Sequence, residues 1–449
     1  MNGTKLRVIE KISYGLGDAG CNIVWQTAML FLAYFYTDVY GLSPAHMGTM
    51  FLAVRFIDAI TDPLMGTIID RTQSKYGRYR PYILWMAIPF GLACTMVFYT
   101  PDLSDTGKVV YAYASYIFLT LMYTALNVPY CALANTLTED SNERTSLQSY
   151  RFALNSVSAL IVALLALPLV DLIGGGNKQV GYFGAIAVMS VIAIVMFGLC
   201  FSNTKERFQV KNEETKQNAY KDLKLLLKSK QWQILFAANV ILLVAILIKN
   251  STTLYYVNNV LDRPDLATAL MVTTLVCAVV GALISPPLFN RFEKSKAYSG
   301  LIVASGLLSG ALYFVSPTNI TGIFILTAAY GLVQMATSPL IWSMMSDLAD
   351  YESAKAGRTL NGIVFATILF AIKAGIALGG AAVGWILAFA DYQPGAASQA
   401  GDVVNTISLM FTIIPGLTMI AVAIILIPYG LDKKTVASIQ PNSEAVIAK

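Results

Sequence analysis

Three charged residues interrupt an apolar stretch near the start of the chain, in the segment RFIDAITDPLMG (55–66). Asp58 and Asp62 are four residues apart, so they share one face of a helix, and Arg55 lies one turn earlier. A charge in hydrocarbon costs about 2.5–3.5 kcal/mol or more, so such residues face an interior cavity and are functional candidates. The two carboxylates repel each other unless a positive species lies between them, and a proton or Na⁺ would serve.

This pair therefore predicts a cation site. Thr61 adds a hydroxyl beside the carboxylates, and oxygen ligands suit a hard cation such as Na⁺. The alternative is a structural salt bridge between Arg55 and one aspartate, which would leave the other aspartate without a partner. Both interpretations stay open on the sequence.

A second polar face lies in the segment YTALNVPYC (123–131). Tyr123 and Asn127 are four residues apart and Thr124 and Asn127 are three apart, so all three can line a pocket. Pro129 frees a backbone carbonyl one turn earlier. The alternative for Asn127 is a hydrogen bond that packs two helices together.

A third polar stripe repeats every four residues in the first apolar segment, through Tyr14, Asp18, Asn22 and Gln26, with Trp25 beside it. Amides and carboxylates bind hydroxyl groups, and flat rings cover the apolar face of a sugar. The stripe therefore predicts sugar recognition. Asp18 could instead lie at the cytoplasmic edge of the membrane.

Three basic residues also fall within apolar segments. Arg151 either extends to the membrane surface or reaches the pocket. Lys249 is expected near the outer end of its segment, where its side chain would extend to the surface. Lys373 lies too deep for that, so we expect it to pair with an acid or to bind a substrate oxygen.

Charged clusters at the ends of the apolar segments are candidate gates, because an ion pair that forms in only one state biases a two-state equilibrium. The alternative is that these charges fix topology or are simply solvated. The candidates are Asp70, Arg78 and Arg80 in the first half, and Asp347, Asp350 and Arg358, near Glu352 and Lys355, in the second.

The composition places all these residues in a membrane protein. The 449 residues are 56% hydrophobic and 13% charged, with a mean hydropathy of +0.61. Apolar stretches of about 20 residues, enough to cross a bilayer, recur along the chain. Twelve spans are predicted, at 13–38, 45–70, 81–100, 109–136, 150–173, 180–201, 233–258, 266–289, 298–315, 320–346, 360–390 and 404–429.

The basic residues set the expected orientation. Most of the 31 Lys and Arg residues fall on the termini and on the loops that follow spans 2, 4, 6, 8 and 10. The loops that follow the odd-numbered spans hold Lys108, Lys178 and Arg263. Both termini are therefore expected in the cytoplasm. The modest net charge of +5 reflects this topology and predicts no nucleic-acid partner.

Nothing in the sequence predicts an enzyme or a cofactor. The five cysteines all lie in apolar spans without the spacing of metal ligands, and the single histidine, His46, cannot form a zinc site or a proton relay. We expect four parts: a six-helix bundle at 1–201, a cytoplasmic loop at 202–231 with a short amphipathic helix, a second bundle at 232–430, and a cytoplasmic tail at 431–449.

Several motifs resemble the glycoside–pentoside–hexuronide:cation symporters, the family of the melibiose permease. The matching segments are KISYGLGDAG, FYTDVYGLS, RFIDAITDPLMGTIIDRTQSKYGRYRP, NVPYCAL, ERTSLQSYRF, MSDLADY and FAIKAGIALGG, which together cover nearly the whole chain. The resemblance implies a major facilitator fold of twelve transmembrane helices in two halves. It also implies a bacterial inner-membrane location.

The resemblance implies roles for individual residues. Asp58 and Asp62 match the cation-site aspartates of the family, and Thr124 matches a hydroxyl near them. Tyr123, Arg151 and Lys373 match pocket residues. Asn22 and Asn127 stand where the melibiose permease has sugar-binding aspartates, and Cys131 stands where it has a tryptophan.

The segments YGLGD and NVPYCAL resemble the branch that carries β-xylosides, glucuronides and related glycosides, and that branch shares Asp18 and Asn127. Thr61 stands where the melibiose permease has asparagine, and this difference weakens the case for Na⁺ by analogy with that permease. At the expected gate, DYESAKAGRT replaces the DYGEW…GRR pattern of the family. We therefore expect a monomeric transporter that imports a glycoside with H⁺ or Na⁺ by alternating access. An uncoupled facilitator or a transporter-like sensor is the alternative.

Overall fold

The computed structural model describes residues 6–72, 74–138, 141–208, 219–289, 292–358, 360–396 and 398–431, and within these ranges the chain is helical with no strand. The chain forms two compact units, residues 1–213 with 393–397, and residues 214–392 with 398–449. The centre of the expected middle loop, 209–218, and the expected tail from 432 onward lie outside the described residues.

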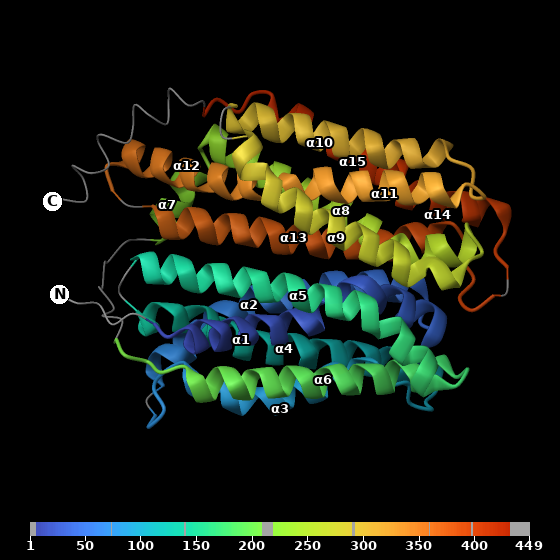
Figure 1. Ribbon diagram of the computed structural model, residues 1–449, viewed down its shortest axis with the longest axis horizontal. Helices are drawn as coiled ribbons and strands as arrows, with labels where there is room; N and C mark the ends of the chain where they lie inside the picture. Colours follow the sequence, from blue (N-terminus) through green and yellow to red (C-terminus); the bar gives the residue numbers. More distant parts are fainter. Residues whose placement is uncertain are drawn as a thin grey trace. The chain divides into compact units, whose positions relative to one another are not determined.

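Six long helices build the first unit: α1 (Val8–Thr27), α2 (Pro44–Arg71), α3 (Arg80–Val97), α4 (Asp105–Leu137), α5 (Ser141–Gly174) and α6 (Lys178–Asn203), with the π-helical turns η1 (Ala28–Leu32) and η2 (Phe35–Val39) after α1. α1 packs against α5 and α6, and α2 packs against α4 (Figure 1). Glycine allows the close approach of α1 to α5, because a Cβ at Gly15 would lie 3.0 Å from the Tyr150 carbonyl oxygen.

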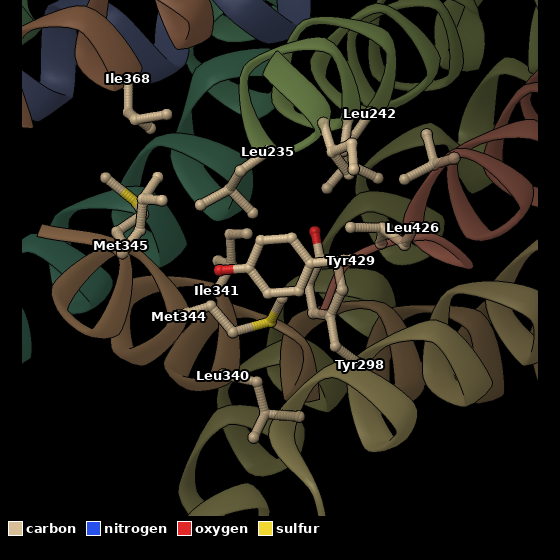
Figure 2. Packing of buried hydrophobic residues seen from close by; sticks show 14 of the residues in the cluster. Leu235, Leu242, Tyr298, Leu340, Ile341, Met344, Met345, Ile368, Leu426 and Tyr429 are labelled. Atoms are coloured by element: carbon tan, nitrogen blue, oxygen red, sulfur yellow. The ribbon is translucent and has the colours of Figure 1, made fainter. Parts of the chain in front are cut away.

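The second unit contains α7 (Ala219–Leu226), α8 (Lys230–Asn259), η3 (Pro264–Leu266), α9 (Ala267–Phe289), α10 (Lys294–Ala311), η4 (Leu312–Phe314), α11 (Ile320–Ala336), α12 (Ser338–Ala356), α13 (Asn361–Phe389), α14 (Gly401–Phe411) and α15 (Ile413–Leu426). Leu235 from α8, Tyr298 from α10 and Met344 from α12 share one core (Figure 2). Leu226 of α7 is fully buried in the same core. The amphipathic helix expected in the middle loop is therefore present and packs into this unit.

The predicted all-α membrane fold is confirmed. Ten helical segments in the described ranges are long and apolar enough to cross a membrane, and they correspond to predicted spans three to twelve. The first two predicted spans are not in this set: α1 carries Glu10, Lys11 and Asp18, and many side chains of α2 from residue 56 onward lie outside the described residues.

Candidate functional site

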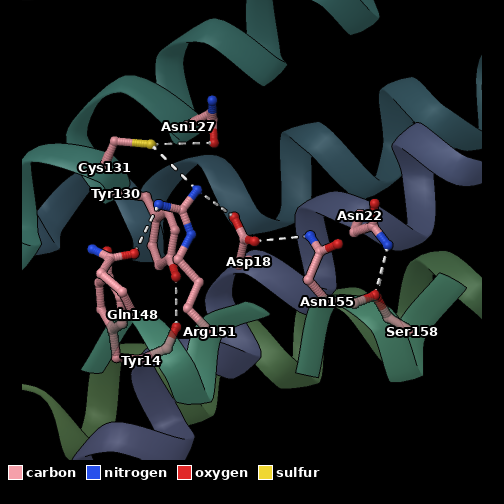
Figure 3. A network of polar contacts seen from close by, with 10 residues as sticks. All are labelled: Tyr14, Asp18, Asn22, Asn127, Tyr130, Cys131, Gln148, Arg151, Asn155 and Ser158. Atoms are coloured by element: carbon pink, nitrogen blue, oxygen red, sulfur yellow. Dashed lines mark hydrogen bonds and ion pairs between the residues drawn. The ribbon is translucent and has the colours of Figure 1, made fainter. Parts of the chain in front are cut away.

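An ion pair between α1 and α5 lies at the centre of the polar network of the first unit. The guanidinium of Arg151 donates through Nη2 to Asp18 Oδ1 at 2.9 Å, and the Asn155 amide donates to Asp18 Oδ2 at 2.8 Å (Figure 3). Asp18 is only 6% exposed. Asp18 is therefore a buried carboxylate paired with Arg151, and both residues belong to the packing of α1 on α5.

Asn22 contributes to the packing of α1 on α5. Its side-chain amide donates both hydrogens, to the Asn155 carbonyl and to Ser158 Oγ, each at 2.9 Å (Figure 3). Only its carbonyl oxygen is left for another group. Tyr14, at the start of the predicted stripe, is fully buried against Tyr130 at a ring distance of 4.8 Å. Tyr14 therefore supports the helix packing.

The accessible edge of the network comes from α4. The Cys131 thiol lies 3.8 Å from Asn127 Oδ1 and 3.9 Å from Arg151 Nη2, and Cys131 is exposed (Figure 3). Asn127 and Arg151 are only partly buried. An amide, a guanidinium and a thiol thus present donors and acceptors on one open face, as hydroxyl recognition requires.

A second ion pair lies within α2. Arg55 Nη1 donates to Asp58 Oδ2 at 2.7 Å, and Asp58 is 4% exposed. The Arg55 guanidinium also faces the ring of Trp25 at 5.3 Å, and Trp25 stacks on Tyr123 at 5.8 Å. Trp25 therefore connects the candidate cation site to the aromatic face of the candidate sugar site.

The other predicted cation ligands lie on the same helices. Thr61 Oγ1 donates to the Asp58 carbonyl at 3.5 Å, and Thr124 is buried on α4, which packs against α2. Asp62 is on α2 four residues after Asp58, but its side chain lies outside the described residues. The structure thus describes Asp58, Thr61 and Thr124 of the predicted set.

Two further predicted sugar-site residues are partly buried. Gln26 lies on α1, next to Trp25 in sequence, and Lys373 lies on α13 of the second unit.

Sequence analysis missed the part of the site that α5 supplies. Gln148 accepts from Arg151 at 3.4 Å, and Asn155 and Ser158 bind Asp18 and Asn22. Together with Arg151 these residues fall at intervals of three or four along LQSYRFALNSVS (147–158), so they share one helix face. The sequence could have predicted this face, because its polar residues repeat at the same spacing as the stripe in the first span.

The α2–α3 loop is held by a carboxylate that the sequence did not single out. Glu206, just after α6, accepts the backbone N–H groups of Arg78, Tyr79 and Arg80 at 2.8–2.9 Å. The Arg80 side chain donates to the Phe201 carbonyl at 2.7 Å. These contacts anchor the loop to α6; the Asp70 side chain, the expected partner in a gate, lies outside the described residues.

Gly77→Ala is expected to lower the apparent Tm of the purified protein by about 5 °C more than the matched change Gly176→Ala. Both glycines have a positive φ, of 104° and 97°. A Cβ at Gly77 would lie 2.4 Å from Glu206 Cδ, whereas nothing lies within 4 Å of one at Gly176. Equal shifts in a thermal-unfolding assay would show that the Glu206 contact contributes no stability.

The candidate gate residues of the second unit have other partners than the nearby Lys355. Asp347 pairs with Lys294 at 2.7 Å, and Arg358 pairs with Asp222 of α7. Asp350 is partly buried. Glu352, which could have been a solvated charge, is fully buried and accepts from Ser229. The Asp222–Arg358 pair anchors α7 to the α12–α13 turn.

A similar anchor ends the first unit. Arg207 pairs with the buried Glu10 of α1. Burial favours a higher pKa for the Glu10 carboxyl, but hydrogen bonds from the Arg7 backbone and the Arg207 side chain, with the charge of Arg207, bring its pKa below the ordinary value. Each end of the middle loop is thus tied to the unit that it joins.

Lys249 differs from its prediction. Its side chain was expected to extend to the membrane surface, but the residue is only 3% exposed and its ammonium group is bound inside the second unit. The prediction was wrong because the groups that bind Lys249 come from distant helices.

Comparison with known proteins agrees with the geometry. Residues 13–433 match the family described as MFS/sugar transport protein. The putative glycoside/cation symporter YagG of Escherichia coli K12 is 45% identical over 97% of this chain and 95% of its own length. The isoprimeverose transporter of Lactiplantibacillus pentosus is 33% identical, over 94% of this chain and 89% of its own.

Solved structures support the fold alone, because their sequence identity is low. A point mutant of the nucleoside transporter NupG aligns with a TM-score of 0.68 at 13% identity, over 94% of this chain and 100% of its own. A D-xylose–proton symporter aligns with a TM-score of 0.64 at 13% identity, over 94% and 96%. The chain therefore belongs to the MFS/sugar transport family, as a multi-pass membrane transporter of the glycoside–pentoside–hexuronide type and not an enzyme.

Proposed function

We propose that this transporter imports a glycoside together with H⁺ or Na⁺ across the bacterial inner membrane, with both termini in the cytoplasm. The observation that carries the proposal is the continuous set of contacts from Asp58 through Arg55, Trp25 and Tyr123 to the face that bears Asn127. The names of the relatives, a glycoside/cation symporter and an isoprimeverose transporter, support the same class of substrate.

The charge balance of the network favours an uncharged glycoside, such as a xyloside, over a glucuronide. The positive charge of Arg151 is matched by Asp18 at 2.9 Å, so the pair adds no net charge to the face. A guanidinium paired in this way can donate its remaining N–H groups to a sugar hydroxyl without requiring a carboxylate on the substrate.

The cation would act through Asp58 and Asp62. Arg55 offsets one negative charge, so the second carboxylate is left to a proton or to Na⁺. Arg55 contacts both Asp58 and the ring of Trp25, so a bound cation would change the strength of both contacts. Trp25 stacks on Tyr123, which belongs to the proposed sugar site. Coupling then follows from the linked binding of two ligands, and the ion gradient drives uptake.

The direct test is transport by proteoliposomes under an imposed Na⁺ or pH gradient. Radiolabelled isoprimeverose is the probe, with a β-xyloside and a β-glucuronide as competitors. Accumulation above the outside concentration under one gradient is expected, with stronger competition from the xyloside. Uptake that only equilibrates would indicate a facilitator, and binding without uptake would indicate a sensor; either result contradicts the proposal.

Cys131 offers an independent test of the sugar site. N-Ethylmaleimide should alkylate Cys131 first, because Cys21, Cys94 and Cys200 are buried and Cys277 is half-buried. Isoprimeverose at ten times its dissociation constant should slow this alkylation by about tenfold, since about one site in eleven stays empty. Cys131→Ser is the control that identifies the labelled residue by mass spectrometry. An unchanged rate with saturating sugar would place the sugar elsewhere.

A further inference from the structure

Lys249 of α8 is a buried lysine with no role in the proposed sugar or cation sites. Its ammonium donates to the Phe411 carbonyl at 2.8 Å and to Ser309 Oγ at 3.1 Å. The residue is 3% exposed, and Ser309 is fully buried. An ionised group in such surroundings is costly unless its neighbours replace the lost water, so this arrangement calls for a reason.

The reason lies in the last span, which breaks between α14 and α15. Thr412 separates the two helices with φ −120° and ψ −74°, and Pro415 follows in the first turn of α15. In a continuous helix the N–H of residue 415 would donate to the Phe411 carbonyl, but proline has no N–H. Lys249 donates to that same carbonyl oxygen.

A second contact reaches the neighbouring carbonyl. The Thr412 carbonyl accepts the Gly416 backbone N–H at 3.2 Å and also accepts from Ser309 Oγ at 2.9 Å, while the Ser309 oxygen accepts from Lys249. Just beyond, α10 and α15 approach at Gly306 and Gly416, where a Cβ on Gly306 would lie 2.7 Å from the Gly416 carbonyl oxygen. The break is thus contacted by Lys249 of α8 and by Ser309 of α10.

The surroundings of Lys249 suit a positive charge. No carboxylate pairs with it among the side chains that the structure describes. The faces of two aromatic rings take that place, with Nζ 4.1 Å from the ring centre of Phe411 and 4.5 Å from that of Tyr330. Ring faces and carbonyl oxygens both carry partial negative charge and stabilise an ammonium ion.

We propose that the Lys249 ammonium is a resident cation that replaces the backbone donor lost at Pro415 and thereby fixes the break in the last span. Lys249 is then a positioning residue: it keeps the second unit rigid when the transporter changes state. Only this last step rests on the proposed transport function, and the contacts at the break can be tested without any substrate.

A double-mutant cycle tests the replacement of the lost donor. Lys249→Met keeps the length of the side chain but removes its N–H groups and charge, so the apparent Tm of the detergent-purified protein should fall by about 5 °C. Pro415→Ala supplies a backbone N–H to the Phe411 carbonyl. In that background Lys249→Met should cost less than half as much. Equal losses in both backgrounds would overturn the proposal, as would a Lys249→Met protein as stable as wild type.

Chemical rescue tests the charge and covers the case in which Pro415→Ala fails to fold. Lys249→Ala should regain at least half of its lost stability in methylammonium chloride, but not in tetramethylammonium chloride of equal concentration, whose cation has no N–H. Lys296→Ala, at an 81% exposed side chain, is the control and should respond to neither salt. No rescue of Lys249→Ala by methylammonium would contradict a resident cation.

Transport separates this inference from the proposed function. Isoprimeverose uptake by Lys249→Met should show a maximal rate at least about tenfold below wild type with KM within twofold, because the residue does not touch the sugar. An unchanged maximal rate would overturn the positioning role. If wild type carries no glycoside while the stability results appear as expected, the proposed function fails and the resident cation stands.

Discussion

Asp58→Asn is expected to abolish cation-driven accumulation of the glycoside, with a loss of at least about a hundredfold in initial uptake. The substitution removes the carboxylate that pairs with Arg55 at 2.7 Å, and both groups are largely buried. Breaking such a pair from one side costs about 3–5 kcal/mol, because the remaining charge stays buried without its partner. Uptake in proteoliposomes under each imposed gradient measures the effect.

The same loss would follow from a purely structural salt bridge, so a second variant is needed. Arg55→Met with Asp58→Asn removes both members of the ion pair and should restore folding, since neither member is left buried without the other. It should still lack any increase in sugar affinity on addition of Na⁺ or on acidification. If this double variant regains cation-dependent accumulation, Asp58 belongs to the structure only and the cation site lies elsewhere.

A matched control is available at the surface. Asp265 pairs with Arg263 at 2.7 Å, the same distance, but their side chains are 59% and 53% exposed. Pairs this exposed contribute little, so Asp265→Asn should transport within about twofold of wild type. A large loss in this control would indicate that the assay reports general damage to the protein.

Sequence alone was sufficient for features that repeat within one helix. Spans three to twelve follow from the length of the apolar stretches, and the shared faces of α1 and α2 follow from spacings of three or four residues. These patterns are local, because one turn of helix sets which side chains share a face. The same logic would have found the stripe of Gln148, Arg151 and Asn155 on α5.

Contacts between distant helices could not be obtained in this way. Asp18 and Arg151 are 133 residues apart, and Glu206 binds amides at least 126 residues before it. Lys249 shows the consequence most clearly, since its ammonium group is bound by Phe411 and Ser309, which belong to other helices. A lysine near the end of an apolar segment suggests an extended side chain only until those partners are known.

Arg151→Gln is expected to have the second largest effect, a loss of about a hundredfold or more in isoprimeverose affinity. It leaves Asp18, which is 6% exposed, with only the Asn155 amide as partner. Part of this damage concerns stability and part concerns binding, because Arg151 also borders Cys131 and Asn127 on the open face. Equilibrium binding and thermal unfolding on the same preparation separate the two.

Asp18→Asn combined with Arg151→Gln distinguishes a structural from a recognition role. Two amides can hydrogen-bond to each other without any buried charge, so the apparent Tm should return to within about 3 °C of wild type. Affinity should stay at least about tenfold weaker, because the amide lacks the forked donors of a guanidinium. Arg151→Lys keeps the charge but loses the fork, and should also bind weakly while folding normally. If the double variant binds sugar within threefold of wild type, Arg151 serves only to hold α5 against α1, and the sugar must be bound by other groups.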